Sequence, residues 1–375
     1  MTGHSKTIVF FSRYIPSMGG IENYTHSLAK KLIELGNNVL VITTDGEPGI
    51  SCEDGIQVCR LRKISLLNGR YPIPNLVGLY KKIIPLLNGY NDTCIVLNGR
   101  YYVLSNIGAR IANLMGLTPI LIDHSSSFIP TKSSVLSSLL KNAEIVTTNL
   151  LKRYNINYYG VSRMSSKWLS TFDINSKGEI NNAIDVEAFN ELNSGRLFLN
   201  RGNRLIITYA GRLIGEKGVL QVANLACIFP TSIDVIIAGS GPLEDTLTQL
   251  SKQYNNLHYV GRLSHPDLSA LLNQTDVFCF PSRYPEGMPT CLLEAAACKC
   301  ALVTLANGGT DEIIPDPSYG FVLKSGDDSE LAALIERFID NPSLYKTCAS
   351  REYEHVLQAF SWNQTALKLL EAFER

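Results

Sequence analysis

Largely apolar runs alternate with segments of helical periodicity along the chain, and this alternation predicts parallel α/β structure. The run KTIVFFSRY (6–14) is typical of a strand buried on both faces. After the turn PSMGG (16–20), residues 21–36 carry apolar side chains at helical spacing, and NVLVITT (38–44) is apolar again. A strand, a glycine-rich turn, a helix and a second strand are the usual start of a parallel sheet covered by helices.

The pattern occurs twice, and the two sets predict two domains. In the first set, strand-like runs at 93–99 and 119–125 flank a helix at 103–115. A polar stretch follows, and the second set begins with the strand LIITYA at 205. The length of 375 residues also exceeds one ordinary core. We therefore predict an N-terminal domain over 1–190, a linker over 191–204, a C-terminal domain over 205–358 and a final helix over 359–375.

Composition narrows the class of protein. Lys plus Arg and Asp plus Glu both number 34, so the chain is neutral, which argues against nucleic acid as a partner and against general attraction to anionic lipid. The nine cysteines have no C-x-x-C spacing, which favours reduced thiols in a cytoplasmic protein. No apolar run is long enough to span a bilayer, and no leader is expected. No His/Asp cluster has metal-ligand spacing, so no metal cofactor is expected.

The stretch PSRYPEGMPTCLLEAAACKC (281–300) carries the strongest chemical signal. Turn residues precede a short apolar helix, for which Thr290 is the expected N-cap. Because a helix that is apolar on all sides is usually buried, its one carboxylate, Glu294, needs partners. Glu286 lies in the loop before the helix, whose free N–H groups form an anion site. Two carboxylates beside an anion site suit a nucleotide-sugar, although a solvated position would explain either glutamate alone.

Three further places could bind a ligand. Gly19 and Gly20 precede the first predicted helix and allow close approach to backbone amides, but a simple tight turn is an equal alternative. His124 ends a predicted strand, where open α/β sheets bind ligands, but a lone histidine is often structural. Arg212 and Lys217 follow the first strand of the second domain. A guanidinium can grip phosphate oxygens and an ammonium adds a point charge, whereas the alternative is two solvated cations.

Taken together, these motifs resemble the retaining glycosyltransferases of family 4, within the glycosyl transferases group 1. Glu286 and Glu294 match the two glutamates of the E-x7-E signature, and PS-x-x-x-EG-x-P and LEA-x-A-C surround them. Arg212 and Lys217 match the family's GR-L-x-x-x-KG element. The sequence departs from the family pattern at Lys299, where a glycine that tolerates positive φ is usual.

The resemblance implies the GT-B architecture, two Rossmann-like doubly wound α/β domains facing one another across a cleft, with the last helix packing back on the first domain. The implied reaction transfers a sugar from a UDP- or GDP-linked nucleotide-sugar donor to a hydroxyl of a saccharide or lipid-linked saccharide acceptor, with retained anomeric configuration. It implies catalytic positions facing the donor sugar at His124 and Glu286. The implied donor-binding positions are Gly19, Gly20, Arg212, Lys217, Gly287, Met288, Pro289, Thr290 and Glu294. Within this set the two cations would hold the diphosphate, and Glu294 the ribose.

Other kinds of protein share parts of this pattern. A nucleotide-sugar epimerase or a phosphorylase has the same architecture, and a non-catalytic sugar-nucleotide binding protein would keep the fold. A Rossmann dehydrogenase is less well supported, because the G-x-G-x-x-G fingerprint is absent.

The segment 60–82 interleaves basic and apolar residues. This pattern predicts either peripheral contact with a membrane surface or the solvated face of a core helix. Its cations are Arg60, Arg62, Lys63, Arg70, Lys81 and Lys82. Membrane contact would suit a lipid-linked acceptor at the inner face of a bacterial plasma membrane, as in the assembly of lipopolysaccharide, O-antigen or capsule.

Overall fold

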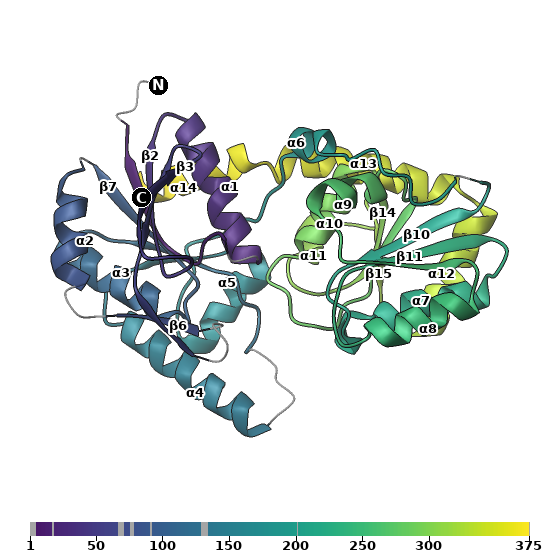
Figure 1. Ribbon diagram of the computed structural model, residues 1–375, viewed down its shortest axis with the longest axis horizontal. Coiled ribbons are helices and arrows are strands. Elements are labelled where there is room, and N and C mark those ends of the chain that lie inside the picture. The colour runs from purple at the N-terminus through teal and green to yellow at the C-terminus, as the bar shows by residue number, and fades with distance from the viewer. Residues whose placement is uncertain are drawn as a thin grey trace. The chain divides into compact units, whose positions relative to one another are not determined.

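The computed structural model describes residues 5–16, 19–66, 71–75, 79–90, 92–128, 134–200 and 202–374. They form two compact units, each built on one mainly parallel sheet with helices on its faces (Figure 1). The first unit is Met1–Asn182 together with Trp362–Arg375, and the second is Ala183–Ser361.

A seven-stranded sheet forms the centre of the first unit. In spatial order its strands are β3 (Gly49–Glu53), β4 (Ile56–Arg60), β2 (Asn38–Thr43), β1 (Thr7–Phe11), β7 (Thr93–Asn98), β8 (Ile120–Asp123) and β9 (Asn157–Gly160). All neighbours are parallel except β3 and β4. Every side chain of the central strand β1 is buried, which explains its nearly unbroken apolar sequence. A separate antiparallel pair consists of β5 (Lys63–Leu66) and β6 (Tyr71–Pro74).

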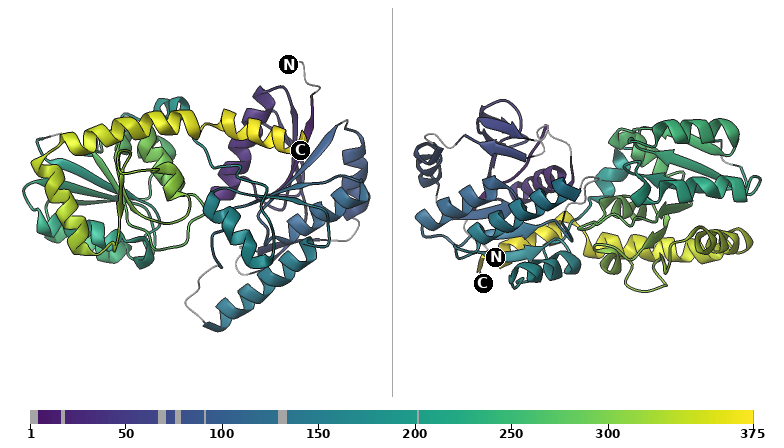
Figure 2. Two further views of the ribbon diagram at one scale, coloured as in Figure 1. Left: turned by 180° about the vertical axis from the view of Figure 1, so that it is seen from behind. Right: turned by 90° about the horizontal axis from the view of Figure 1, so that it is seen from below.

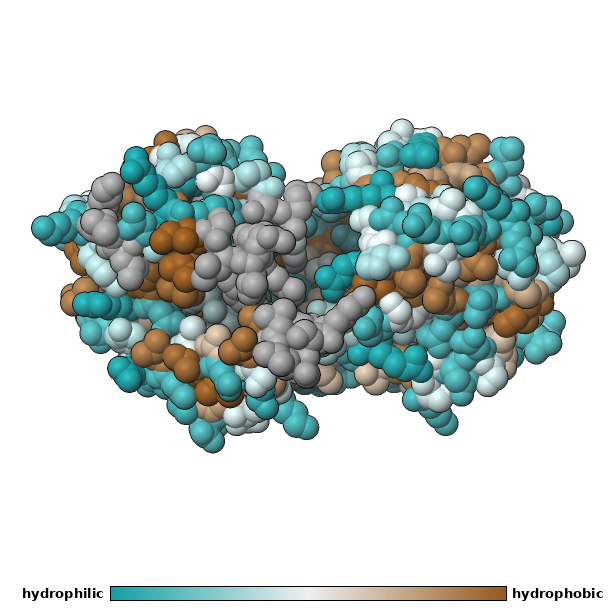
Figure 3. All heavy atoms as spheres, turned by 60° about the horizontal axis from the view of Figure 1, so that its bottom comes forward, coloured by the Kyte–Doolittle hydropathy of each residue, from teal (hydrophilic) through white to brown (hydrophobic). Residues whose placement is uncertain are grey.

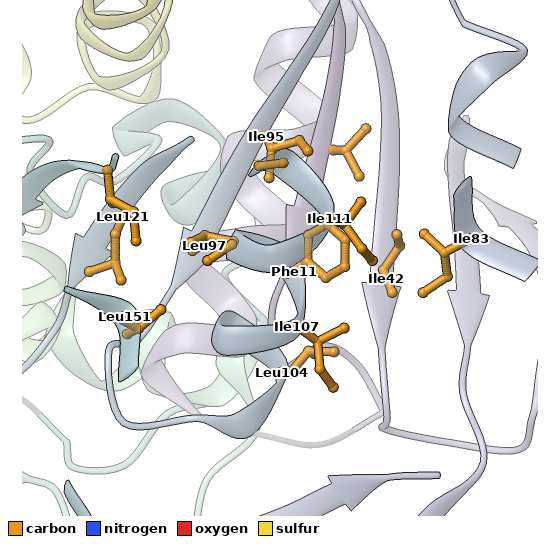
Figure 4. Packing of buried hydrophobic residues seen from close by; sticks show 14 of the residues in the cluster. Phe11, Ile42, Ile83, Ile95, Leu97, Leu104, Ile107, Ile111, Leu121 and Leu151 are labelled. Carbon is orange, nitrogen blue, oxygen red and sulfur yellow. The ribbon is translucent and has the colours of Figure 1, made fainter. Parts of the chain in front are cut away.

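Helices close the core of the first unit. They are α1 (Gly20–Glu34), α2 (Leu79–Asn88), α3 (Val103–Leu114), α4 (Ser134–Leu151), α5 (Arg163–Leu169) and α14 (Trp362–Glu374). Figure 4 shows Phe11 and Leu97 of the sheet facing Ile107 and Ile111 of α3. The segment 79–88 is therefore a core helix, since Ile83 of α2 is also buried in this cluster.

The final helix returns to the first unit, where α14 packs against α1 (Figure 2). Leu369 is fully buried, and Thr365 Oγ1 donates a hydrogen bond to the carbonyl oxygen of Asn181 at 3.1 Å. Within the described part of the chain, no helix is both long enough and apolar enough to cross a membrane.

A six-stranded, wholly parallel sheet forms the centre of the second unit. In spatial order its strands are β12 (Leu257–Gly261), β11 (Ile233–Ala238), β10 (Leu205–Ala210), β13 (Val277–Phe280), β14 (Ala301–Leu305) and β15 (Phe321–Leu323). The helices are α6 (Val186–Glu191), α7 (Val219–Ile228), α8 (Glu244–Gln253), α9 (His265–Leu272), α10 (Thr290–Ala297), α11 (Thr310–Ile313), α12 (Asp328–Asp340) and α13 (Ser343–Ala359).

The segment between the two predicted domains belongs to the second unit, which begins at Ala183. Asn190 Nδ2, in α6, donates to the carbonyl oxygen of Ala297 at 2.9 Å. Beyond α6, the backbone N–H of Ser194 donates to the carbonyl oxygen of Pro266 at 3.2 Å. These hydrogen bonds hold residues 183–194 against the helices of the second unit, whereas the sequence predicts a first domain that extends to residue 190 and a linker over 191–204.

Candidate functional site

The first part of the site is the turn that follows β10. Arg212 comes two residues after this central strand, and Lys217 ends the short 3-10 turn Gly215–Lys217. The hydroxyl of Tyr209 fixes the turn by donating to the carbonyl oxygen of Arg212 at 3.0 Å. Because β10 has neighbours on both sides, its carboxyl end is a rigid place from which to present both cations.

The loop after β13 is fastened to this turn. The backbone N–H groups of Arg283 and Tyr284 both donate to the carbonyl oxygen of Glu216, at 2.7 and 3.0 Å. Gly218 adopts a φ of +72°, and a Cβ there would lie 2.5 Å from the carbonyl oxygen of Pro281, so only glycine fits this contact. The two loops are therefore one packed substructure.

Asn307 holds the same loop from its other side. Its Nδ2 donates to the carbonyl oxygens of Ser282, at 3.1 Å, and of Tyr284. Its Oδ1 accepts from the N–H of Glu286 at 3.4 Å. A Cβ on the adjacent Gly308 would lie 2.5 Å from the carbonyl oxygen of Glu286. The backbone at Glu286 is therefore tightly confined.

This packing brings Lys217 and Glu286 into contact. Lys217 Nζ lies 2.9 Å from Glu286 Oε1, and the two side chains are only 15% and 18% exposed. The ammonium also lies 5.2 Å from the centre of the Phe280 ring. The Arg212 guanidinium lies 5.1 Å from the centre of the Tyr284 ring and makes no ion pair with a described residue. Two cations and one carboxylate thus share a small, partly buried area.

Helix α10 begins directly after this loop. Its N-cap is Pro289, and Thr290 is its first residue. The prediction that Thr290 caps the helix was wrong, because the chain enters the helix one residue earlier, through a proline whose φ of −74° suits that position. The N-cap residue of α10 makes no side-chain hydrogen bond to the helix. Of the predicted donor-binding residues just before the helix, Met288 and Pro289 are buried and Gly287 is half-buried.

Glu294 lies on α10 among buried apolar residues, as its sequence predicts. Leu292, Leu293 and the three alanines that follow Glu294 are buried. Glu294 is half-buried, and it has no hydrogen-bond or ion-pair partner among the described residues. Burial raises the pKa of its carboxyl group to about 7. The group is therefore available to a ligand that donates hydrogen bonds.

The end of α10 keeps its turn without the glycine usual in the family. Lys299 adopts a φ of +58°. Its N–H donates to the carbonyl oxygen of Ala296 at 2.9 Å, and the N–H of Cys300 donates to that of Ala295 at 3.0 Å. These two hydrogen bonds form a Schellman motif, in which a left-handed residue ends the helix. A lysine takes the place of glycine here, and its ammonium lies 4.5 Å from the centre of the Tyr353 ring.

His124 lies in the first unit, directly after β8. Its ring meets that of Tyr24 edge to face, with 4.8 Å between centroids. Burial lowers the pKa of His124 to about 3, so the imidazole is neutral. Its Nε2 is buried and has no hydrogen-bond partner among the described residues. The neighbouring Asp123 accepts from Arg100 Nε at 3.0 Å, and this buried ion pair fixes the strand end.

Gly19 is the N-cap of α1, and Gly20 is its first residue. A Cβ at Gly19 would lie 2.5 Å from Glu22 Oε2, so a carboxylate already lies at the start of this helix. Glu22 is buried, which raises its pKa, and it lies 3.5 Å from the Arg13 guanidinium. Sequence reasoning missed Glu22, although an acidic residue in the first turn of a helix is a familiar signal.

The basic segment 60–82 is only partly available to a surface. Arg60 is held internally, because Nη1 pairs with Glu53 at 2.6 Å and Nε donates to the carbonyl oxygen of Asp45 at 3.0 Å. Arg62 and Lys81 are exposed, and Lys63 Nζ lies 4.0 Å from Asp45 Oδ1. Arg70 and the side chain of Lys82 lie outside the described residues.

The part of the chain that carries the two loops and α10 matches the model of a known family. The model of the family described as glycosyl transferases group 1 matches residues 197–355, which include Arg212, Lys217, Glu286 and Glu294. Over this region the chain is similar to the glycosyl transferases of group 1.

Relatives match nearly the whole chain. An uncharacterized glycosyltransferase of Methanocaldococcus jannaschii is 22% identical over 386 residues, covering 99% of this chain and 98% of the relative. The GPI3 subunit of phosphatidylinositol N-acetylglucosaminyltransferase from Saccharomyces cerevisiae is also 22% identical, covering 96% of this chain and 80% of the relative.

Solved structures of other proteins define the fold. HepE of Anabaena, in complex with UDP, has a TM-score of 0.76 at 19% identity, with 98% of this chain and 99% of that chain covered. Sucrose-phosphate synthase of Thermosynechococcus elongatus has a TM-score of 0.75 at 18% identity, with 98% of both chains covered. The fold is therefore GT-B, with two Rossmann-like α/β domains, as the sequence resemblance implies.

Proposed function

We propose that this protein transfers a sugar from a nucleotide diphosphate sugar to an acceptor hydroxyl with retention of anomeric configuration. The observation that carries the proposal is the packed pair of loops that gathers Arg212, Lys217 and Glu286 next to the uncapped N-terminus of α10. Cations and free backbone N–H groups at one place suit a diphosphate, and a carboxylate beside them suits sugar hydroxyls.

The chemistry needs negative charge to be stabilised as the glycosidic bond to the diphosphate breaks. We assign Arg212, Lys217 and the N-terminus of α10 to the stabilisation of that charge. We assign Glu286 to hydroxyls of the donor sugar and Glu294 to the ribose hydroxyls. We assign His124, whose neutral ring has a free buried Nε2, to the reacting sugar. Because cationic side chains fill the role of a Lewis acid here, we propose transfer without a metal.

The relatives suggest which substrates to try first. HepE of Anabaena has been crystallised with UDP and with UDP-glucose, so UDP-sugars lead the candidates for the donor, ahead of GDP-sugars. The GPI3 subunit belongs to an enzyme named for transfer of N-acetylglucosamine to phosphatidylinositol, which makes a lipid-linked acceptor a natural candidate beside a free saccharide.

A donor screen tests the proposal. Each of UDP-, GDP- and ADP-linked glucose, N-acetylglucosamine and mannose would be incubated with the protein and a panel of glycosides, and release of nucleoside diphosphate measured. We expect one donor to give a product whose anomeric configuration, measured by NMR, is the same as that of the donor. The rate of this transfer should not change when EDTA is added, and it should be much lower in the His124→Ala variant. Isomerised sugar without acceptor would identify an epimerase instead, and donor binding without turnover a non-catalytic protein.

We further propose peripheral contact with a membrane during bacterial cell-surface polysaccharide assembly. Besides Arg62 and Lys81, helix α4 offers an exposed apolar row in which Leu139 is 62% and Val146 58% exposed. Figure 3 brings the side that carries α4 forward and shows apolar patches among hydrophilic residues. Sedimentation with vesicles containing phosphatidylglycerol should fall with salt and with Leu139→Ser. Equal binding of the variant would exclude α4 as the contact.

A further inference from the structure

We propose that Glu286 competes with the donor diphosphate for Lys217, and that it thereby helps to expel the nucleoside diphosphate after transfer. The inference rests on the proposed function, because it gives Glu286 a second role at the same site. It is carried by the ion pair in which Lys217 Nζ lies 2.9 Å from Glu286 Oε1.

The surroundings of this pair make the competition unavoidable. The side chains of Lys217 and Glu286 are 15% and 18% exposed, so water screens their charges poorly. Phe280 and Tyr284 lie on the ammonium, with ring centres 5.2 and 5.7 Å from Nζ. A phosphate that reached Lys217 would bring negative charge beside the Glu286 carboxylate, and like charges in a poorly solvated place repel. Diphosphate binding therefore separates Glu286 from Lys217.

Arg212 differs from Lys217 in this respect. Its guanidinium lies over the Tyr284 ring, at 5.1 Å, and has no carboxylate partner within the described ranges. Arg212 is therefore free to meet an incoming phosphate while Lys217 is still paired. The ammonium then changes partner, and the freed Glu286 carboxylate can accept hydroxyl groups of the donor sugar.

The same exchange runs in reverse after transfer. Once the sugar has left, the carboxylate has lost its hydroxyl partners, and re-pairing with Lys217 weakens the hold on the diphosphate. The exchange needs only side-chain rotation, because the Glu286 backbone is confined: Asn307 Oδ1 accepts its N–H, and Gly308 packs against its carbonyl oxygen. Glu286 thus acts both on the sugar and on product release.

Calorimetric titration with UDP, GDP, ADP and pyrophosphate tests the inference on the full chain. Glu286→Gln removes the competing charge and keeps the shape of the side chain. We expect it to bind the diphosphate about tenfold more tightly, which corresponds to ~1.4 kcal/mol, and to release it more slowly in stopped-flow dissociation. Glu286→Ala should show the same direction, which guards against misfolding of one variant.

Two controls separate competition from a general change of charge. Glu336→Gln removes the same charge from an exposed position on α12 and should leave the affinity unchanged. In a Lys217→Met background, Glu286→Gln should no longer tighten binding. If the wild type binds a diphosphate and both Glu286 variants bind it no better, or if the tightening survives Lys217→Met, the inference is overturned. If the wild type binds none of the four probes, the proposed function itself fails.

Discussion

Arg212 and Lys217 differ in their partners, and this difference shapes what each substitution should do. Arg212 makes no ion pair with any described residue, so Arg212→Ala breaks no internal pair. It should weaken binding of donor and of free nucleoside diphosphate alike by about 1.5–3 kcal/mol, because both ligands carry the diphosphate. Arg212→Lys keeps the charge but loses the planar fork, and should recover only part of the affinity. Unchanged affinity of Arg212→Ala for the diphosphate would remove the guanidinium from the site.

The ribose-binding role proposed for Glu294 predicts that nucleotide affinity depends on pH. Burial raises the pKa of its carboxyl group to about 7, so the group gains a proton as the pH falls through neutrality. Only the carboxylate accepts hydrogen bonds from both ribose hydroxyls, and affinity should therefore fall as the pH falls. Glu294→Gln should bind nucleotide more weakly at high pH, by on the order of 1–3 kcal/mol, and should lack this pH step. Calorimetric titrations with nucleotide at pH values below and above 7 would measure this pH dependence. An identical pH dependence in Glu294→Gln and the wild type would contradict the assignment of Glu294 to the ribose.

Glu352 should make the stability of the second unit depend on pH. It lies on α13, fully buried, and both carboxylate oxygens lack a hydrogen-bond partner among the described residues. Burial raises its pKa from 4.5 to about 9. Between these values the folded chain holds a proton that the unfolded chain has lost. The free energy of unfolding should therefore decrease as the pH rises, by ~1.4 kcal/mol per pH unit from this group.

Denaturant unfolding at about pH 6 and about pH 8 tests this linkage. Glu352→Gln removes the titrating group and should flatten the dependence. Glu354→Gln, on the exposed side of the same helix, should keep it. Equal slopes in Glu352→Gln and the wild type would mean that the carboxyl group is not held in its neutral form.

At the scale of residues, the sequence predicted the buried surroundings of Glu294 but not the ion pair between Lys217 and Glu286. The apolar neighbours of Glu294 on its own helix were enough to place it in poorly solvated surroundings. The contact between Lys217 and Glu286 could not be predicted, because it depends on two loops from different strands being fastened together through Glu216. The roles of His124, Gly19 and Gly20 stay predictions that rest on the family resemblance.

Most of the helices and strands could be predicted from the sequence. Strands such as β1 and β10 are buried on both faces, and their nearly continuous apolar runs carry that information locally. The ends of helices were harder to predict than the helices themselves, as the wrong prediction for Thr290 shows. Which residue is the N-cap depends on the backbone conformation with which the chain enters the helix. The turn after α10 is another case, since Lys299 gives no sequence signal for its left-handed conformation.

Lys299 offers a test of how that turn is stabilised. A non-glycine residue with a φ of +58° is strained by about 1–2 kcal/mol relative to glycine. The cation–π contact with Tyr353 offsets part of that strain, by ~0.5–1 kcal/mol. Lys299→Ala keeps the strain and loses the contact, so it should lower the unfolding free energy. Lys299→Gly loses the contact and the strain, and should be more stable than Lys299→Ala in thermal unfolding. The reverse order would show that the turn is not left-handed.

At the scale of the whole molecule, the chain forms two compact units, and the first contains a helix from the far end of the sequence. Periodicity alone identified a terminal amphipathic helix, but only the family resemblance assigned it to the first domain. Periodicity could not identify the packing partner of this helix, because α14 packs against α1, which lies at the other end of the sequence. The pattern of apolar residues within α14 shows that one face is buried, but not against which helix.

This arrangement predicts that a substitution in the last helix destabilises the first unit alone. Leu369 of α14 is fully buried, so Leu369→Ala leaves a cavity and should lower the free energy of unfolding by about 2–5 kcal/mol. Leu367 is 40% exposed on the same helix, and Leu367→Ala is the matched control, expected to have little effect. Both tryptophans, Trp168 and Trp362, belong to the first unit, so tryptophan fluorescence reports on its unfolding alone.

Hydrogen exchange of amides in β10 and β11 provides the complementary measurement on the second unit. In Leu369→Ala the fluorescence transition should move to lower denaturant while exchange in those strands keeps its wild-type rate. The cavity lies within the first unit, so Leu369→Ala should lower the free energy of unfolding of the second unit only if the two units unfold cooperatively. Equal destabilisation of both would show that the chain unfolds as one cooperative body, and equal effects of Leu367→Ala and Leu369→Ala would show that α14 does not bury this face.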